Sequence, residues 1–361
     1  MAFHYASEGN GSDVALPTLS TMENVRLEGL YKSLADIDRN IQAYAYPAMF
    51  TIGGFWNLLI MVYFIEFNLK KGLKRMSSYH FHVIHLALTD LLVNVGNGIL
   101  KHYKSKLSWE LGKWGCILFE RFVMVICLLA SSWNLVFISY SRYRSIVYPL
   151  AKRLSKRKCS LISLIIWMVP CLANIYPFMK TKLLKLPPKG ALICMADLSS
   201  QLRMVHFSAN FLLDSFIPLA LMLYFYRKMA RAMTQEENAN HLSSQSHHNN
   251  RRALKIIRRL VFLFTISVVT TRFLLFLRVF LDMYAFKRPP FYKIIMMHNM
   301  ISSSFVHILF YSNNMLNIFI YAKMIPGFRR FLLTFFTFGM YERRNVINRS
   351  DEQTSIETTT H

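Results

Sequence analysis

The sequence predicts an all-α membrane protein in which a seven-transmembrane helix bundle forms the whole folded part. Hydrophobic residues make up 53% and aromatic residues 14% of the 361-residue chain, which is more than soluble domains of this length usually contain. A helix needs about 20 mostly apolar residues to cross a bilayer, because each residue rises ~1.5 Å through a hydrocarbon layer ~30 Å thick. The windows that meet this requirement are 41–65, 83–100, 122–140, 159–179, 204–226, 260–281 and 294–322.

Charged residues are rare inside these windows. The first, third, fourth and seventh windows contain no Asp, Glu, Lys or Arg, and the other three contain only Asp90, Asp214, Arg272 and Arg278. The connecting segments are mostly too short to fold separately, so the helices must bury their polar groups against one another. We therefore expect one bundle rather than several domains.

The distribution of Lys and Arg predicts the orientation in the membrane. Basic residues cluster after the first, third, fifth and seventh windows, and positive charge keeps short flanking segments on the cytoplasmic side. The bundle at residues 43–338 should therefore lie between an extracellular tail, 1–42, and a cytoplasmic tail, 339–361. The outer tail contains Asn10 in an Asn-Gly-Ser sequon, so Asn10 is a candidate glycosylation site.

The five cysteines predict one disulfide. Cys127 and Cys171 lie inside windows, and Cys159 lies at a cytoplasmic helix end, where the medium is reducing. Only Cys116 and Cys194 face outside, so we expect a disulfide that ties the start of the third helix to the loop after the fourth.

Particular residues within these windows resemble the rhodopsin-like G-protein-coupled receptors, and the resemblance runs over residues 46–338. The segment after the seventh window resembles the short amphipathic eighth helix of that family. The residues that carry the resemblance are Gly54, Asn57, Asp90, Trp109, Gly112, Cys116, Arg142, Tyr143, Pro149, Leu150, Trp167, Pro177, Pro218, Tyr226, Asn317 and Tyr321.

The chain also departs from the family pattern. Ser141 stands where the family has an acid, Ile318 replaces a proline, and residues 267–270 replace Cys-Trp-x-Pro. Without that proline we expect the sixth helix to keep its regular hydrogen bonds and lose the usual kink. The stretch from Cys116 to Arg142 is one residue longer than usual, which a helical bulge or an altered loop would absorb.

The resemblance implies that residues at the cytoplasmic ends couple to a heterotrimeric G protein. Arg142 is a permanent cation that can donate to backbone carbonyls of a partner's helix end; alternatively, it snorkels to the lipid headgroups. Because Ser141 is neutral and residues 251–259 contain no acid, we expect activity without ligand. The residues assigned to coupling and activation are Arg142, Tyr143, Tyr226, Asn317 and Tyr321.

A buried acid in the second window suggests an ion site. Charge at mid-bilayer costs about 2.5–3.5 kcal/mol on insertion scales, so such a residue faces the interior and usually has a function. The resemblance implies a sodium ion that stabilises the resting state; the alternative is a hydrated structural network. No other cofactor is expected. The residues assigned to sodium are Asp90, Ser131, Asn313 and Asn317.

Charged and polar residues in the outer half predict a ligand pocket. A biogenic amine is disfavoured because no Asp lies at the family's amine-binding position, and retinal is disfavoured because Tyr311 stands where opsins have a lysine. Basic residues there and in the outer loops favour a peptide or an anionic small molecule, unless Asp214 and Arg272 only satisfy each other. The residues assigned to the pocket are Glu120, Arg121, Met124, Asp214, Arg272, Arg278, His307 and Tyr311.

The expected partners follow from the same resemblance. They are an extracellular ligand, a G protein, membrane lipid, and receptor kinases with arrestin acting on the Ser- and Thr-rich C-terminal tail. The net charge of +24 is spread over membrane flanks, so nucleic acid is not expected. No enzyme motif occurs, and a transporter or channel lacks support. The plasma membrane is the expected location, and a decoy or scaffold that does not activate G proteins is the alternative function.

Overall fold

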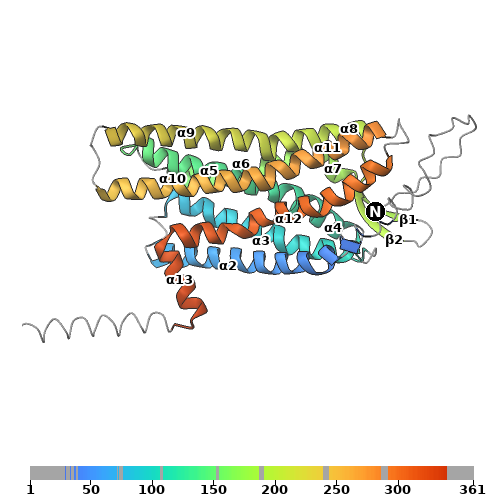
Figure 1. Cartoon of the computed structure of the whole chain (residues 1–361), viewed down its shortest axis with the longest axis horizontal. Helices are drawn as coiled ribbons and strands as arrows, with labels where there is room; N and C mark the ends of the chain where they lie inside the picture. Colours follow the sequence, from blue (N-terminus) through green and yellow to red (C-terminus); the bar gives the residue numbers. More distant parts are fainter. Residues whose placement is uncertain are drawn as a thin grey trace, which may run out of the picture.

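The computed structural model of the chain is an elongated bundle of helices (Figure 1). It describes residues 40–70, 76–105, 109–151, 154–186, 191–238, 244–285 and 292–339, with residues 29, 33, 36, 37 and 72, and leaves some side chains within these ranges undescribed.

The elements follow the predicted windows in order. The first half of the chain contains η1 (Ile41–Ala45), α2 (Tyr46–Lys70), α3 (Ser78–Ser105), α4 (Gly112–Ile117), η3 (Leu118–Cys127), α5 (Leu128–Val147), α6 (Lys156–Ala173) and α7 (Ile175–Met179). The second half contains β1 (Thr181–Leu186), β2 (Ala191–Ala196), α8 (Ser200–Phe211), η4 (Leu212–Phe216), α9 (Ile217–Asn238), α10 (Ser244–Phe264), η5 (Thr265–Val269), α11 (Thr270–Ala285), α12 (Tyr292–Met324) and α13 (Pro326–Phe336).

The described helices have the length and composition of membrane spans. Within the described residues, five stretches qualify: Ala43–Lys70, Ser78–Leu100, Val125–Val147, Gln201–Gln235 and Asn249–Leu277. The outer face of the bundle is apolar as well, since large side chains of α6 such as Leu161, Leu164 and Leu172 are more than half exposed. An apolar exterior over long helices indicates a multi-pass membrane protein.

The fourth window is less regular than predicted. Residues 159–179 divide between α6 and α7 at Asn174, whose side chain donates to the carbonyl of Pro170 at 2.9 Å. Pro177 has no N–H to donate to the carbonyl of Ala173, so α6 ends at Ala173 and the window does not form one continuous helix.

The predicted disulfide is present between Cys116 and Cys194, whose Cα atoms lie 5.5 Å apart. It joins α4 to an antiparallel hairpin in which β1 pairs with β2. The hairpin corrects the all-α prediction, which treated this segment as a loop. Leu100 and Trp109 bury the disulfide in a small apolar cluster at the end of the bundle that carries the hairpin.

Within the described residues, η1 precedes α2, and three further π-helical segments interrupt longer helices. The first, η3, lies between Cys116 and Arg142, and a π-helical turn accommodates an extra residue without a loop. The bulge predicted as one of two alternatives for the longer third helix is thereby confirmed.

The segment η5 corrects a second prediction, because the sixth helix is π-helical at residues 265–269 and does not keep regular α-helical hydrogen bonds there. The physical reason lies in its hydroxyl side chains. Thr265 donates to the carbonyl of Val261 at 2.8 Å, and Ser267 donates to that of Leu263 at 2.5 Å. Such bonds compete for carbonyls that the backbone would otherwise use.

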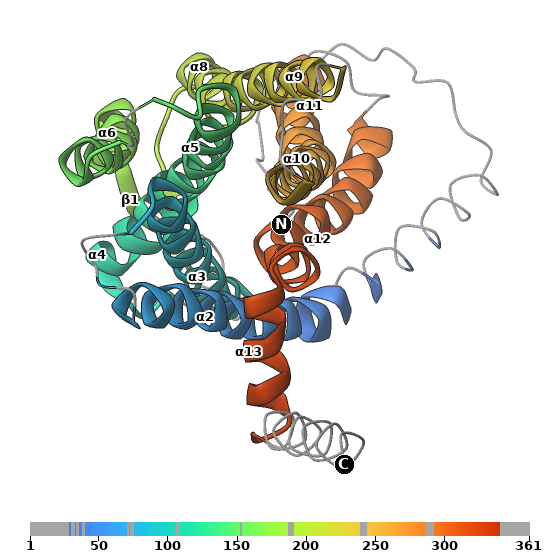
Figure 2. The same ribbon diagram turned by 90° about the vertical axis from the view of Figure 1, so that its left-hand side faces the viewer.

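The end-on view shows how the helices pack. In Figure 2, α3 lies between α2 and α5, and α13 leaves the end of α12 across the bundle axis. Phe328 anchors α13 because it is fully buried and its ring meets that of Tyr63 edge-on at 5.0 Å.

Gly96 lies where α3 packs tightly against η3, and a Cβ atom there would overlap Cγ1 of Val123. Gly96→Ala should lower the thermal melting temperature of the purified protein, because overpacking against a stiff β-branched side chain costs about 1–3 kcal/mol. Gly98→Ala is the matched control, since its Cβ would lie at an ordinary 3.6 Å from Phe50. Equal melting temperatures for the two variants would contradict this packing.

Candidate functional site

Asp90 lies at the centre of a polar cluster formed by three helices. This residue of α3 is fully buried. Ser131 of α5 donates to one carboxylate oxygen at 2.7 Å, and Asn317 of α12 donates to the other at 2.9 Å. These contacts bring together three of the four residues that were assigned to sodium from the sequence.

Further buried asparagines lie on the same helices and on α2. Asn57 of α2 donates to the backbone carbonyl of Asn314 at 2.7 Å, and Asn94 donates to the carbonyl of Asp90 at 2.7 Å. The side-chain oxygens of Asn57 and Asn94 are buried without a hydrogen-bond partner. Asn313, the fourth predicted sodium ligand, donates instead to Asn314 at 3.4 Å.

The sequence interpretation did not include Asn94. The available signal was its position one helical turn after Asp90, which places both residues on the same face of α3.

The charge of Asp90 has no partner of opposite sign in the described part of the chain, where no Lys, Arg or His forms an ion pair with it. An isolated carboxylate in apolar surroundings is costly, and it gains either a proton or a cation. Hard cations take oxygen ligands, and the cluster offers carboxylate, hydroxyl and amide oxygens. These residues therefore fit a small cation such as sodium.

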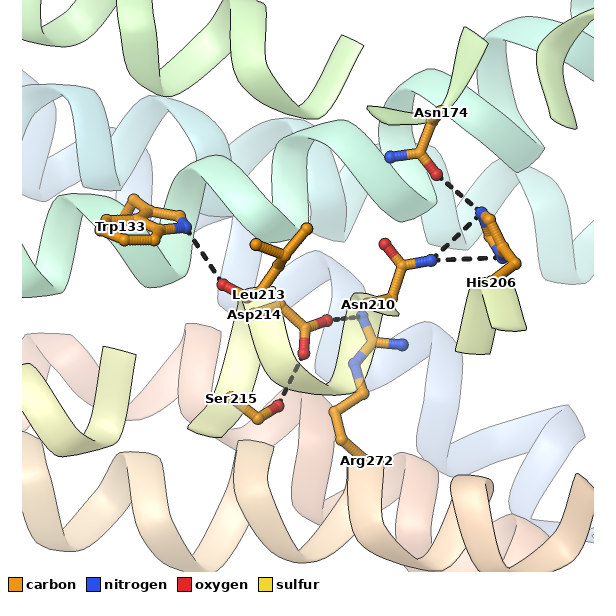
Figure 3. A network of polar contacts seen from close by, with 8 residues as sticks. All are labelled: Trp133, Asn174, His206, Asn210, Leu213, Asp214, Ser215 and Arg272. Carbon is orange, nitrogen blue, oxygen red and sulfur yellow. Dashed lines mark hydrogen bonds and ion pairs between the residues drawn. The ribbon is translucent and has the colours of Figure 1, made fainter. Parts of the chain in front are cut away.

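A buried ion pair lies between η4 and α11. Arg272 of α11 contacts Asp214 of η4 at 2.7 Å, and Ser215 donates to the same carboxylate at 2.6 Å (Figure 3). Both partners are largely buried, with 17% of the Arg272 side chain and 2% of the Asp214 side chain exposed. The guanidinium also lies 5.3 Å from the ring centre of Phe310. The pair joins the fifth and sixth predicted spans.

A hydrogen bond from the third span holds η4 in place. In Figure 3, the indole of Trp133 donates to the carbonyl of Leu213 at 3.1 Å, directly before Asp214. In α8, which directly precedes η4, the His206 ring contacts the Asn174 side-chain oxygen at 2.8 Å. These polar contacts fix the position of the fifth span against the third and fourth.

A small cavity connects the ion pair with the Asp90 cluster. Its volume is about 10 Å³, which is room for roughly one water molecule. Asp214 and Arg272 line one side, and Ser131 and Asn314 line another. Arg272 Nε and Asn314 Nδ2 are both buried without a hydrogen-bond partner. Ser131 therefore belongs to both polar groups.

Of the predicted pocket residues, Asp214 and Arg272 line the small cavity, whereas Tyr311 lies elsewhere. Tyr311 is not among the residues that line the cavity; it is buried, donates to Asn97 at 2.9 Å, and meets the Phe50 ring at 4.8 Å. The other predicted pocket side chains lie outside the described part of the structure: Glu120, Arg121, Met124, Arg278 and His307. Asn10 also lies outside it.

Of the predicted coupling residues, Asn317 belongs to the Asp90 cluster, whereas Arg142, Tyr143 and Tyr321 pack against aromatic rings. Arg142 stacks on the ring of Tyr79, with Cζ 3.6 Å from the ring centre. The ring of Tyr143 packs 5.2 Å from that of Phe225, and Tyr321 is almost fully buried.

Two further residues lie near this part of the bundle. Tyr226 is half-buried on α9. Arg259 of α10 donates to the sulfur of Met324 at 2.7 Å and so joins the sixth predicted span to the seventh.

Comparison with known proteins gives one family and several partial relatives. The model of the family described as "7 transmembrane receptor (rhodopsin family)" matches residues 56–321. Tachykinin-like peptides receptor 86C of Drosophila melanogaster is 24% identical over 201 residues, 53% of this chain and 40% of that protein. A purinoceptor of Cavia porcellus is 30% identical over 138 residues, 37% of this chain and 36% of that protein. These matches thus cover less than half of each relative.

Breaking the buried ion pair should destabilise the bundle. Arg272→Met leaves the Asp214 carboxylate buried without its cation, which we expect to cost about 3–5 kcal/mol. The double variant Asp214→Leu/Arg272→Met removes both charges and should recover most of the loss. Thermal melting of the wild type, both single variants and the double variant gives the coupling free energy. Additive losses would contradict the pairing.

Proposed function

Because the chain belongs to the rhodopsin family of seven-transmembrane receptors, we propose that it binds an extracellular ligand and activates a heterotrimeric G protein through the cytoplasmic ends of spans three, five and six. The observation that carries this proposal is Arg142, which retains the family position and lies at the cytoplasmic end without a carboxylate partner in the described structure. A guanidinium in this position can donate to carbonyls at the end of a partner helix.

The proposal includes the complete receptor architecture. Seven spans at residues 43–338 would separate an extracellular tail, 1–42, from a cytoplasmic tail, 339–361, in the plasma membrane. The amphipathic helix α13 would be the family's eighth helix, because it follows the last span and packs Phe328 under the bundle. Receptor kinases and arrestin are proposed partners of the cytoplasmic tail. The protein would act as a receptor and not as an enzyme.

The proposed ligand is a peptide or an anionic small molecule. Arg272 is a buried cation whose Nε lacks a hydrogen-bond partner. Lys180, Lys182 and Lys185 lie on or beside the outer hairpin. Lys182 contacts Asp197 at 2.7 Å and lowers the pKa of that carboxyl. A basic outer surface raises the local concentration of anions.

The relatives' names are compatible with either form of ligand, since they describe a peptide receptor and a purinoceptor. The proposed pocket adds the undescribed side chains of Glu120, Arg121, Met124, Arg278 and His307 to Asp214 and Arg272. Tyr311 would act from behind the pocket, because it is buried against α2 and α3.

We propose that the Asp90 cluster binds sodium in the resting receptor. The support is a fully buried carboxylate without a paired cation, together with the unpartnered amide oxygens of Asn57 and Asn94. Ser131 and Asn317 would orient the carboxylate, and Asn313 would act from the neighbouring cavity. A bound cation supplies positive charge that the helices themselves lack.

A decoy or scaffold that binds ligand without activating G proteins is the second candidate. Two observations favour it: Ile318 replaces a proline in the seventh span, and η5 replaces the proline kink of the sixth. Both changes affect helices that would have to move during activation.

Basal G-protein activation separates the two candidates. Cells with the wild type should show activation above untransfected cells, and Arg142→Ala should abolish it at matched surface expression, because the neutral Ser141 leaves Arg142 available to the G protein. Arg144→Ala is the matched control, since this arginine lies on the same helix end and contacts Tyr140 at 3.5 Å. It should keep most of the activity.

The measurement requires a panel of G-protein subtypes. A signal that is equal in the wild type and Arg142→Ala would contradict the proposed role of Arg142. If neither the wild type nor the variants gave a signal, with or without candidate ligands, the decoy would be favoured.

A further inference from the structure

The contact between Arg142 and Tyr79 joins α5 to α3 at the cytoplasmic end of the bundle. The guanidinium carbon lies 3.6 Å from the centre of the Tyr79 ring, which is stacking distance for a planar cation over an aromatic face. Tyr79 is 3% exposed, so water screens this contact very little.

The ring is held in place by its own neighbours. Phe64 of α2 meets the Tyr79 ring edge-on, with ring centres 6.4 Å apart and an interplanar angle of 75°. Phe64 in turn packs 6.0 Å from the ring of Tyr321. Packing from α2 and α12 therefore fixes the face that Tyr79 presents to Arg142.

No carboxylate competes for Arg142 in the part of the chain that the structure describes. The neighbouring residue is Ser141, and residues 251–259 of α10 are basic. The aromatic face is therefore the attractive group that the fold provides for this cation.

The contact with Tyr79 does not satisfy all the hydrogen-bond donors of Arg142. Arg142 Nε is buried without a hydrogen-bond partner, and so are the hydroxyls of Tyr79 and Tyr321. Leaving buried donors unsatisfied is unfavourable, so a partner that offers carbonyl oxygens would draw Arg142 away from the ring.

We propose that Tyr79 is a positioning residue, whose ring face holds Arg142 against α3 in the resting receptor and releases it to the G protein. This inference rests on the proposed receptor function. The ring takes the place of an acidic partner, and the hydroxyl of Tyr79 contributes nothing to the restraint. A stacking contact is weaker than a buried ion pair, so the restraint is partial and basal activity remains.

The test compares basal G-protein activation among Tyr79 variants at matched surface expression. Tyr79→Phe keeps the ring face and should stay within about twofold of the wild type. Tyr79→Leu removes the ring and should raise basal activation at least threefold. Tyr79→Met is a second aliphatic variant, because its flexible side chain tolerates an altered core. A purely structural role would lower the signal with loss of folded receptor, whereas release of Arg142 raises it.

Combining the Tyr79 variants with Arg142→Ala tests whether Tyr79 acts through Arg142. Tyr79→Leu/Arg142→Ala should signal no more than Arg142→Ala alone. Equal activation by wild type, Tyr79→Phe, Tyr79→Leu and Tyr79→Met would overturn the positioning role, and the receptor function would survive if Arg142→Ala still lowered the signal. If neither Arg142→Ala nor any Tyr79 variant changed the signal, both proposals would fail.

Discussion

The bundle depends on providing polar partners for two buried carboxylates, Asp90 and Asp214. Each is satisfied differently: Asp214 contacts a cation from the next span at 2.7 Å, whereas Asp90 receives neutral donors from two other helices. Burial of an unpaired charge is costly enough to decide which helices must be neighbours. Ser131 donates to Asp90 and also lines the cavity beside Asp214. The ion pair and the Asp90 cluster therefore share one polar core.

The π-helical segments place these charged groups. Asp214 lies inside η4, and η5 lies directly before the helix that carries Arg272. A π-helical turn changes the direction of the side chains that follow it and leaves backbone carbonyls to other donors. Trp133 uses one such carbonyl, that of Leu213. The sixth helix, which lacks the family's proline, is therefore interrupted by a π-helical segment instead.

Hydropathy and charge in the sequence were sufficient for the order of the helices, the disulfide, the burial of Asp90 and the pairing of Asp214 with Arg272. They were insufficient where the outcome depends on backbone hydrogen-bond register, as in η4 and η5, or on strand pairing, as in the outer hairpin. The contact of Arg142 with Tyr79 could not be predicted either, because Tyr79 is uncharged and lies on a helix distant in sequence. Side-chain stacking requires the packed structure, whereas burial of charge can be recognised from composition.

If sodium holds the resting arrangement, the Asp90 carboxylate must make the stability of the bundle depend on that cation. The most direct measurement is thermal melting of the purified receptor in sodium chloride and in choline chloride at equal ionic strength, for the wild type and Asp90→Asn. Sodium at roughly tenfold its dissociation constant should stabilise the wild type by about 1.4 kcal/mol, raising its melting temperature by a few degrees, and should leave Asp90→Asn unchanged. The same melting temperature in both salts for the wild type would contradict this dependence.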